Sequence, residues 1–389
     1  MSALLPTYRP ADLAFERGEG AYLYATDGRR FLDFTSGIAV NALGHAHPKL
    51  VAALTEQGRK FWHCSNLFHI PEQERLAERL VANSFADRAF FCNSGAEAVE
   101  CGIKMLRKYH DDNGDPERYR IICAENAFHG RTLTTISAGG QPKHTAGFGP
   151  LVEGFDHVAF GNLNELRMAI THETAGILLE PVLGEGGVVV ADPRYLRDVR
   201  AVADEFGLLL FFDEVQTGMG RTGTLFAYEH ADVTPDVMAL AKGLGGGFPI
   251  GACLATERAA AGMTAGTHGS TFGGNPLAMA VANAVLDVML EKGFLDHVAA
   301  MGKKLHAALA KIAAKYPKVI ADVRGIGLLV GVKCAVPNTD LQAALRAKGL
   351  LTATAGENVV RLLPPLVIGE SEIAEACAMI KEACAEIAA

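Results

Sequence analysis

The sequence contains no cluster of lysine and arginine residues, and it carries a net negative charge. Its 389 residues include 36 basic and 44 acidic side chains, which gives a formal net charge of −8. Proteins that bind nucleic acids without regard to sequence need clustered positive charge, so the charge distribution argues against this kind of nucleic-acid binding. No apolar run reaches the roughly 18 residues that a membrane-spanning helix needs. The chain start lacks a basic stretch followed by an apolar segment, so we expect no signal peptide and a cytoplasmic protein.

The sequence also lacks cysteine pairs with metal-ligand spacing. Eight cysteines are scattered along the chain, and no two of them form a CxxC pair. In a long chain without a signal peptide, this pattern predicts buried thiols in a reducing compartment rather than a disulfide framework or a zinc site. The motif His45-Ala46-His47 has no third ligand at helical spacing nearby, so we expect no metal there.

No internal repeat, low-complexity tract or Pro/Ser-rich linker is present, whereas glycine is abundant. Apolar residues make up 49% of the chain and charged residues 21%, which is typical of a globular protein and excludes general disorder. The 42 glycines are roughly 11% of the residues, against a usual value of about 7%. An excess of this kind predicts many tight turns and places where the backbone approaches another group closely.

The middle of the chain alternates short apolar runs with helical patterns. Helices are expected at 95–110 and 194–206, between runs that are continuously apolar. Continuous runs suit parallel strands covered by helices on both faces, and the alternation predicts a doubly wound α/β fold. The five runs are Ala89–Cys92, Arg120–Ala124, Gly176–Glu180, Leu208–Phe212 and Gly251–Ala255.

A smaller α/β unit is expected after a helix that opens at Asn275-Pro276. The next helix places Val298, Met301, Leu305, Leu309 and Ile312 on one face. Strand-like GIGLLVGV follows, then a helix near 339–348, the strands LLTATA and NVVRLLP, and a terminal helix at 370–388. Residues 20–35 read as a hairpin with a turn at Asp27-Gly28. We therefore expect an N-terminal segment (1–60) that joins a small C-terminal domain (286–389), and a large cofactor-binding domain (61–285).

One segment matches a nucleotide-binding pattern literally. Gly218-Met219-Gly220-Arg221-Thr222-Gly223 has the form GxGxxG and follows a strong strand. A dinucleotide site needs a helix that starts directly after the strand, however, and the residues after Gly223 do not have a convincing helical pattern. A nicotinamide-dependent dehydrogenase therefore remains only a minor alternative.

Three other patterns carry the chemistry. Asn93-Ser94-Gly95-Ala96-Glu97 follows a strand and opens a helix, which favours either an anion site or a plain capping box. Asp213-Glu214 ends a fully apolar strand at the edge where α/β proteins bind ligands, although a surface turn is the alternative. Lys242 follows an apolar stretch and precedes a glycine run, so it is either a desolvated nucleophile or an ordinary solvated lysine.

Together these three patterns fit pyridoxal phosphate. A lysine forms a Schiff base with this cofactor, an aspartate keeps its pyridine nitrogen protonated, and a helix N-terminus holds its phosphate.

The order of several longer motifs resembles the class III aminotransferases. The segments GHAHP, FCNSGAEA, AFHGRT, EPVLGEGG, FFDEVQTGMGRTG, DVMALAKGLGGGFPIGA and HGSTFGGNPLA span residues 44–279, and VVRLLPPLVI continues the match at 359–368. The resemblance implies a fold type I architecture and pyridoxal 5'-phosphate as cofactor. Within the class, it indicates transfer of the terminal amino group of N2-acetylornithine to 2-oxoglutarate, which yields glutamate. Succinylornithine, ornithine and 4-aminobutyrate remain alternative amine donors.

The resemblance also implies roles for the cofactor-binding residues. Lys242 would carry the cofactor, and Asp213 would pair with its pyridine nitrogen. Phe128 and Val215 would cover the two ring faces, and Gln216 would bind the phenolic oxygen. The remaining cofactor-binding residues would be Ser94, Gly95, Ala96, Glu214 and Thr271.

Substrate recognition requires cations because the substrates are carboxylates. By resemblance, Arg361 would bind an α-carboxylate and Arg131 the other carboxylate. Glu185 would neutralise Arg361 while the terminal amine is bound. Thr271 would reach the phosphate in the neighbouring subunit and Ser270 would lie near that subunit's substrate, which implies a homodimer with shared active sites.

Overall fold

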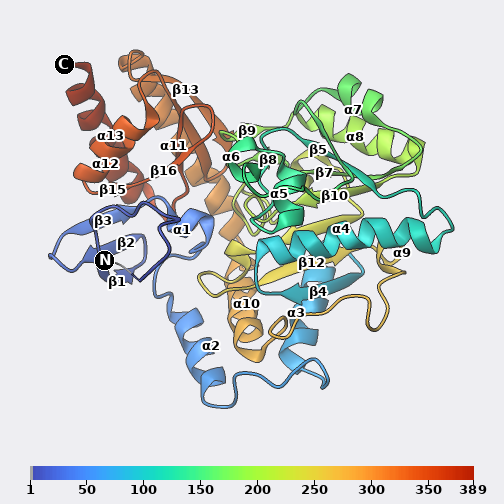
Figure 1. The fold of residues 1–389 in the computed structure, drawn as a ribbon. Helices are drawn as coiled ribbons and strands as arrows, with labels where there is room; N and C mark the ends of the chain where they lie inside the picture. Colours follow the sequence, from blue (N-terminus) through green and yellow to red (C-terminus); the bar gives the residue numbers. More distant parts are fainter. Residues whose placement is uncertain (1–2) are drawn as a thin grey trace.

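The computed structural model describes residues 3–389 and contains one large sheet flanked by helices, with smaller sheets at one side (Figure 1). The large sheet has the strand order β4-β12-β11-β10-β7-β5-β6. Its strands are β4 (Arg88–Cys92), β12 (Gly251–Ala255), β11 (Val237–Leu240), β10 (Leu209–Asp213), β7 (Thr174–Leu179), β5 (Arg120–Ala124) and β6 (Phe155–Val158). All five predicted runs form strands of this sheet, and the α/β prediction is confirmed.

The sheet differs from the prediction in two ways. First, it contains β6 and β11, which the five predicted runs did not include. Second, β12 is antiparallel to both of its neighbours, β11 and β4, whereas the other pairs are parallel. The expectation of a parallel strand at Gly251–Ala255 is therefore wrong. A strand that is buried on both faces has the same continuous apolar pattern in either direction.

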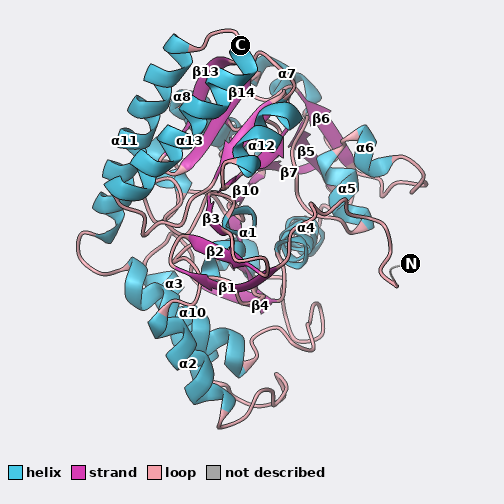
Figure 2. Cartoon of the chain, turned by 90° about the vertical axis from the view of Figure 1, so that its left-hand side faces the viewer, coloured by secondary structure: helices cyan, strands magenta, loops and turns pink. Residues whose placement is uncertain are grey.

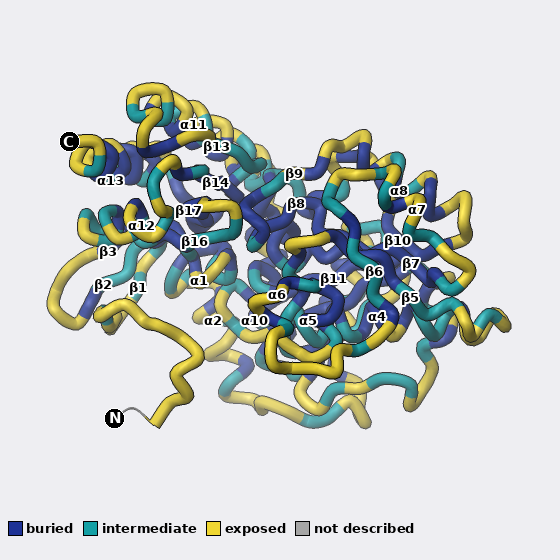
Figure 3. The backbone as a smooth tube through the Cα atoms, turned by 45° about the horizontal axis from the view of Figure 1, so that its top comes forward, coloured by how far each residue is buried: buried dark blue, intermediate teal, exposed yellow. Residues whose placement is uncertain are grey.

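Both faces of the large sheet are covered. Along β10, Leu209 and Phe211 pack into the apolar cluster on the α4 side, while Leu210 and Phe212 pack into the cluster on the α8 side. Successive side chains of a strand point to opposite faces, so an entirely apolar strand is required here. The strands of this sheet accordingly lie in the buried interior in Figure 3.

The two helices predicted for this region, 95–110 and 194–206, correspond to α4 and α8 and lie within two residues of the predicted limits, whereas the other four helices had no predicted limits. The helices of this region are α4 (Gly95–Asp112), α5 (Leu133–Gly139), α6 (Pro142–Thr145), α7 (Leu163–Ala169), α8 (Pro193–Phe206) and α9 (Glu257–Ala260). A Cβ atom on Gly102, in the middle of α4, would lie 2.3 Å from the Phe211 ring. Glycine at position 102 thus allows α4 to lie close against the sheet, which explains one of the many glycines in the sequence.

The N-terminal sheet lies beside the C-terminal part of the chain (Figures 1 and 2), although the two termini themselves are apart. In the N-terminal sheet, β2 pairs with both β1 and β3, and β3 pairs in parallel with β15 from the C-terminal part. Tyr22 Oη donates to Glu375 Oε2 at 2.9 Å, which adds a side-chain contact between the two parts. The strands are β1 (Phe15–Glu19), β2 (Tyr22–Ala25), β3 (Arg30–Asp33) and β15 (Leu350–Leu351). The predicted hairpin and its turn are present, and the division into domains stays a prediction.

The C-terminal part is built around a second four-stranded sheet. The predicted helix with Val298 and Ile312 on one face is α11, and both side chains are buried. The segment GIGLLVGV is not one strand, because β13 and β14 form a hairpin that turns within it. The strands are β13 (Ile320–Ile326), β14 (Leu329–Cys334), β17 (Val359–Leu362) and β16 (Ala353–Ala355), and the helices are α11 (Phe294–Lys315), α12 (Asn338–Ala347) and α13 (Glu370–Ala388).

The remaining elements connect these parts. Asn275 caps α10 through its side chain, as predicted from Asn275-Pro276. These connecting elements are α1 (Ser36–Ala39), α2 (Pro48–Gly58), α3 (Pro71–Ala82), α10 (Pro276–Met289), the two-stranded sheet of β8 (Val182–Leu183) and β9 (Val189–Val190), and two short 3-10 helices, η1 (Ala227–Ala231) and η2 (Lys242–Leu244). Across residues 3–389, no helix is both long and apolar enough to span a membrane.

Candidate active site

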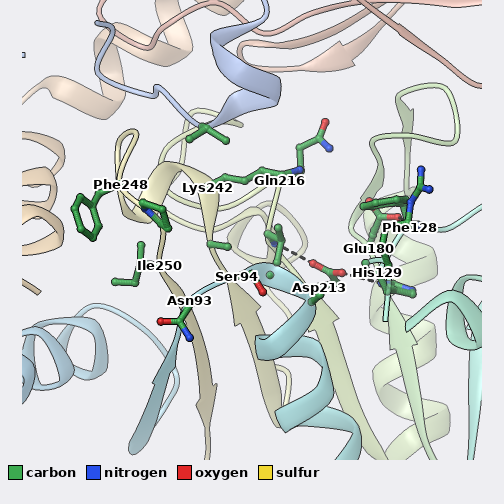
Figure 4. Close-up of a pocket in the computed structure, with 18 of the residues that line it drawn as sticks. Asn93, Ser94, Phe128, His129, Glu180, Asp213, Gln216, Lys242, Phe248 and Ile250 are labelled. Carbon is green, nitrogen blue, oxygen red and sulfur yellow. Dashed lines mark hydrogen bonds and ion pairs between the residues drawn. The ribbon is translucent and has the colours of Figure 1, made fainter. Parts of the chain in front are cut away.

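A cavity of about 480 Å³ opens at the carboxyl ends of β4, β5, β7 and β10. This is the edge at which α/β sheets bind ligands. The cavity brings together nine residues from the sequence prediction, although they come from widely separated parts of the chain (Figure 4). These are Ser94, Gly95, Ala96, Phe128, Arg131, Asp213, Val215, Gln216 and Lys242.

The N-terminus of α4 forms one wall of the cavity. Ser94 caps the helix by accepting a hydrogen bond from the backbone N–H of Glu97, and the Glu97 carboxylate accepts one from the backbone of Asn93 at 2.6 Å. Only the Ser94 half of a capping box is therefore present, because Glu97 bonds the backbone of Asn93 and not that of Ser94. The backbone N–H groups of Gly95 and Ala96 have no acceptors inside the helix, and the helix dipole favours an anion beside them. The cap is thus present, and it leaves these N–H groups free for an anion, so the two interpretations of this motif do not exclude each other.

Asp213 is held by donors from two different segments. Its Oδ2 lies 2.8 Å from His129 Nδ1, and its Oδ1 accepts a hydrogen bond from the backbone of Val215 at 3.0 Å. Both Asp213 and His129 are buried and line the cavity. The sequence pointed to Asp213, but no local pattern identified His129 as its buried partner.

Glu214 lies outside the cavity, although the sequence grouped it with the cofactor-binding residues. Its carboxylate accepts hydrogen bonds from the backbone of Ala227 and Tyr228 and from Thr217 Oγ1. Burial raises the pKa of Glu214 to about 7, against the effect of these donors. Glu214 thus holds the following turn in place.

Lys242 enters the cavity from the short helix η2, directly after β11. Burial lowers the pKa of the Lys242 ammonium to about 8, and the charge of Arg361 acts in the same direction, whereas Asp213, Glu180 and Glu185 oppose the shift. Its backbone has a φ of 45°, in the left-handed region that costs energy for a side chain other than glycine. The amine is therefore desolvated and more easily made neutral, which is what a nucleophilic lysine requires.

Arg361 is tied to the cavity wall through Gln216. Its Nη1 donates to Gln216 Oε1 at 2.9 Å and its Nη2 to Glu185 Oε2 at 3.0 Å. Only 2% of the Arg361 side chain is exposed, against 29% for Glu185. Gly184 allows this close arrangement, because a Cβ atom there would lie 2.6 Å from the Gln216 amide. The predicted partners Arg361 and Glu185 therefore meet, with the glutamate on the solvent side.

Phe128 and Arg131 lie close together in the cavity lining. The Arg131 guanidinium carbon is 5.5 Å from the centre of the Phe128 ring, a distance at which a cation is attracted to an aromatic face. Val215 contacts the helix start instead, since a Cβ atom on Gly95 would lie 2.7 Å from its Cγ1. The two expected ring-covering side chains, Phe128 and Val215, thus come from different segments of the cavity lining.

Ser270 and Thr271 do not line the cavity. Ser270 Oγ accepts hydrogen bonds from Asn93 Nδ2 at 3.1 Å and from the backbone of Gly273 at 3.0 Å. Thr271 is exposed. Ser270 is therefore linked to the cavity only through Asn93 in a single chain, and Thr271 faces outward.

The GxGxxG segment is a structural turn. It is followed by the short helix η1 and not by an α-helix. Arg221 is buried and donates to the carbonyl oxygens of Leu328 at 3.0 Å and Pro364 at 2.6 Å, and burial lowers its pKa to about 9. The segment follows β10 in the chain, and through Arg221 it is hydrogen-bonded to the C-terminal part. It does not have the strand–turn–helix form of a dinucleotide site.

Two functional candidates were missed by the sequence analysis. Besides His129, Glu180 lines the cavity at the end of β7 and accepts hydrogen bonds from the backbone of Phe128 and Gly184. The rule that singled out Asp213, a carboxylate at the carboxyl end of an apolar strand, applies equally to Glu180. The signal for His129 was weaker, because only its place beside Phe128 in the AFHGRT segment pointed to it.

The family is decided by comparison with known proteins. A family model described as "Aminotransferase class-III" matches residues 5–384. The chain belongs to the class-III aminotransferases. The predicted family and enzyme class are therefore confirmed.

Individual members of the family are similar over nearly their whole length. Acetylornithine aminotransferase 1 of Bradyrhizobium diazoefficiens is 60% identical over 99% of this chain and 95% of its own. The structure of N-acetylornithine aminotransferase from Stenotrophomonas maltophilia has a TM-score of 0.86 and 40% identity, and covers 97% of both chains. An ornithine aminotransferase from Toxoplasma gondii, with partial occupancy of PLP at its active site, has a TM-score of 0.95 and 31% identity over 99% of this chain and 92% of its own. These similarities confirm the predicted aminotransferase fold.

Proposed function

We propose that this class-III aminotransferase transfers the δ-amino group of N2-acetyl-L-ornithine to 2-oxoglutarate. The products are N-acetyl-L-glutamate 5-semialdehyde and L-glutamate, which places the reaction in arginine biosynthesis. The observation that carries the proposal is that Lys242, Asp213 and the start of α4 line one cavity. Gln216, in the wall of this cavity, accepts a hydrogen bond from Arg361, which also pairs with Glu185. The relative at 60% identity, named acetylornithine aminotransferase, supports the choice of amine donor.

The cofactor of the enzyme is pyridoxal phosphate, as its family indicates. The cavity fits this group: the first turn of α4 offers backbone N–H groups to the phosphate, and a desolvated lysine amine and a fixed carboxylate face the same space. When bound, pyridoxal phosphate supplies an electron sink for the substrate carbon that loses its proton.

The residues of this chain supply binding, orientation and proton transfer. Lys242 would hold the cofactor and then remove and return the proton at the substrate carbon. Asp213 would stabilise positive charge on the ring nitrogen, and Gln216 would donate its amide N–H to the phenolic oxygen. Phe128 and Val215 would cover the ring faces. Gly95 and Ala96, with the hydroxyl of Ser94, would bind the phosphate.

Two arginines suit a reaction between dicarboxylate and monocarboxylate substrates. Arg131 is exposed at the cavity wall and would bind the α-carboxylate of acetylornithine or the distal carboxylate of 2-oxoglutarate. Arg361 is paired with Glu185. This is the arrangement that we expect while the uncharged methylene chain of acetylornithine, next to its terminal amine, lies beside the pair. Departure of Glu185 would free Arg361 for the α-carboxylate of 2-oxoglutarate.

The first prediction concerns the amine donor. With 2-oxoglutarate as acceptor, we expect kcat/KM for N2-acetylornithine to exceed that for ornithine by at least about tenfold, because the free α-ammonium group of ornithine is an unmatched charge that costs more than about 1.4 kcal/mol. We expect 4-aminobutyrate, which is shorter and lacks the acetamido group, to be a poorer donor as well. Steady-state rates with acetylornithine, succinylornithine, ornithine and 4-aminobutyrate measure this directly. A preference for free ornithine contradicts the proposal, and a preference for succinylornithine moves it to the other acylated substrate. Tight fluorescence-detected binding of a nicotinamide cofactor would instead support the dehydrogenase alternative.

We also propose a cytoplasmic homodimer with shared active sites. Exposed apolar side chains gather where the 62–68 segment meets the loop before α10: Trp62 is 68% exposed, Phe68 67% and Phe272 61%. Asn66 Nδ2 joins these segments by donating to the carbonyl oxygen of Gly273 at 2.8 Å. A patch of exposed large apolar side chains on neighbouring segments is typical of a protein interface. It lies beside exposed Thr271 and would bring that residue, with Ser270, to the partner's cavity.

The second prediction tests this interface. We expect wild type to have twice the chain mass in light scattering, and Phe68→Glu and Phe272→Glu to shift it toward a monomer, because a buried charge without a partner strongly disfavours association. Met168→Glu is the matched control, since Met168 is 85% exposed on α7, away from the patch. A wild-type monomer, or a dimer unaffected by both glutamates, would refute the proposed interface.

A further inference from the structure

The Glu185 carboxylate lies between two cations, of which only one is buried. Its Oε2 accepts a hydrogen bond from Arg361 Nη2 at 3.0 Å, and its Oε1 lies 3.9 Å from Lys143 Nζ. The Lys143 side chain is 56% exposed, against 2% for Arg361. Among residues 3–389, the Lys143 ammonium has no other carboxylate within ion-pair distance. Glu185 therefore has a second cation within reach besides its buried partner.

The helix that carries Lys143, α6, is anchored to the loop that lines the cavity. Gln141, which precedes the helix, donates from Nε2 to the carbonyl oxygen of Ala127 at 2.7 Å. The His144 ring is largely buried and meets the edge of the Phe128 ring at a centroid distance of 5.7 Å. These contacts hold the backbone of Lys143 beside the cavity, although its long side chain is exposed.

The backbone around Glu185 is fixed as well, which leaves the side chain as the part that can change partners. The carbonyl oxygen of Glu185 accepts a hydrogen bond from the backbone of Gly356 at 2.7 Å, and that of Gly187 accepts one from Arg324 Nε at 2.8 Å. A separation of 3.9 Å exceeds the length of a charge-assisted hydrogen bond by only about 1 Å. Rotation of the two side chains alone can therefore join Glu185 to the Lys143 ammonium.

The other basic side chains near the pair do not compete for Glu185. Burial lowers the pKa of His144, and the positive charges of Arg131 and Lys143 act in the same direction, whereas Glu185 opposes the shift. A histidine whose pKa lies below its ordinary value of about 6.5 is mainly neutral at pH 7. Arg131 would bind a substrate carboxylate in both half-reactions. Lys143 is then the cation that remains for Glu185.

The charges of the two substrates require different ion pairs in the two half-reactions. Acetylornithine brings one carboxylate, which Arg131 would bind, and the Arg361–Glu185 pair is neutral in itself. 2-Oxoglutarate brings two carboxylates, which Arg131 and Arg361 would bind. The Glu185 carboxylate then has lost its partner and lies beside a dianion, and like charges at short distance in a partly desolvated site repel each other strongly. A third cation within reach of Glu185 reduces this repulsion.

We propose that Lys143 is a positioning residue for the half-reaction with 2-oxoglutarate: it receives the Glu185 carboxylate when the substrate takes Arg361, and it thereby favours the arrangement in which Arg361 is free to bind a carboxylate. This inference rests on the proposed function, which supplies the exchange of Glu185 for substrate. In this role Lys143 acts through Glu185 and makes no contact with the substrate.

The experiment removes the charge of Lys143 with and without the carboxylate that it would receive. Lys143→Met keeps an unbranched side chain but not its charge, whereas Lys143→Arg keeps the charge. Lys143→Met is also made in a Glu185→Gln background, in which no carboxylate needs a new partner. Lys304→Met is the control, because Lys304 is an exposed lysine of α11 that is paired with Glu370.

Two measurements are made on the cofactor-loaded enzyme. Stopped-flow absorbance gives the rate of each half-reaction as a function of the substrate concentration. Calorimetry gives the Kd for glutarate, a dicarboxylate of the same length as 2-oxoglutarate that lacks the reacting carbonyl group. The second measurement reports on the binding of two carboxylates without any reaction.

We expect Lys143→Met to raise both the Kd for glutarate and the half-saturating concentration of 2-oxoglutarate by about fivefold, because loss of the second partner shifts Glu185 back toward Arg361. The maximal rate with 2-oxoglutarate and the half-reaction with acetylornithine should stay within about twofold of wild type. Lys143→Arg and Lys304→Met should match wild type in every measurement. In the Glu185→Gln background, Lys143→Met should change neither value for the dicarboxylates.

Three results would overturn the inference while the proposed function stands. One is a Lys143→Met enzyme that binds glutarate with the wild-type Kd. Another is an equal loss in both half-reactions, which would show that the lysine acts on the site as a whole. The third is an undiminished effect of Lys143→Met in the Glu185→Gln background, because Lys143 would then act on the substrate directly. A wild-type enzyme that reacts with neither substrate would instead contradict the proposed function.

Discussion

Replacement of Lys242 by alanine is expected to lower kcat by at least about 10³-fold and to remove the visible absorption of the cofactor-loaded enzyme. The amine is the nucleophile and the proton carrier of the proposed reaction, and a positioned general base alone contributes about 10²–10⁴ in rate. Burial already lowers the pKa of this amine to about 8, so removal of the side chain removes a group prepared for the task. Absorption spectra and single-turnover rates measure both effects.

The substitution should leave the fold intact. Both lysine and alanine bear a Cβ atom, so the left-handed backbone at φ 45° costs them about the same. Lys303→Ala is the control, because Lys303 is an exposed residue of α11. If Lys242→Ala retained the visible band and wild-type turnover, another residue would carry the cofactor and the proposed mechanism would be wrong.

The strands near the site were predictable because the sheet is covered on both faces. In β10, every residue from Leu209 to Asp213 is buried, so a continuous apolar run ending in a carboxylate located both the strand and the site edge. The same pattern carries no information on strand direction. The antiparallel orientation of β12 therefore became known only from its pairing with β11 and β4.

The residues of the site were predictable only where a short stretch of sequence determines which way its side chains point. Asp213 and Glu214 are neighbours, and successive side chains at a strand end point to opposite sides. Only one of them could face the cavity, but no local pattern said which, and the family resemblance assigned both to the cofactor site. His129 is 84 positions away from Asp213, and Arg361 is 176 positions away from Glu185. The resemblance to the family predicted the second pair, whereas no local pattern predicted the first.

The glycine excess has a physical explanation at the positions where backbones and side chains crowd one another. Gly102 admits Phe211 beneath α4, and Gly95 admits Val215 beside the phosphate-binding turn. Gly184 admits the Gln216 amide next to Glu185. Two of these three glycines border the cavity region, so part of the excess reflects close packing around the cofactor site.

Removal of the Arg361 guanidinium is expected to affect the two halves of the reaction very differently. Arg361→Leu should lower kcat/KM for 2-oxoglutarate by about 10²–10³, because truncating one partner of a buried charge pair costs about 2–5 kcal/mol. The half-reaction with acetylornithine should change by less than about tenfold, since Glu185 rather than substrate occupies Arg361 in that half. Stopped-flow absorbance with each substrate separately resolves the two.

In the proposed exchange, Glu185 is the member of the pair that we expect to move. Arg361 lies in β17, bonded to Gln216, with its side chain 2% exposed, whereas the Glu185 side chain is 29% exposed and lies 3.9 Å from the exposed Lys143 ammonium. Glu185→Gln should therefore leave the 2-oxoglutarate half-reaction within about threefold of wild type and weaken the acetylornithine half, because a free guanidinium then meets the terminal-amine end of that substrate. Arg30→Leu, on an exposed ion pair with Glu375, is the control for loss of an arginine. Equal losses in both half-reactions for Arg361→Leu would show that this arginine only supports the fold, and the proposed exchange of Glu185 for substrate would be wrong.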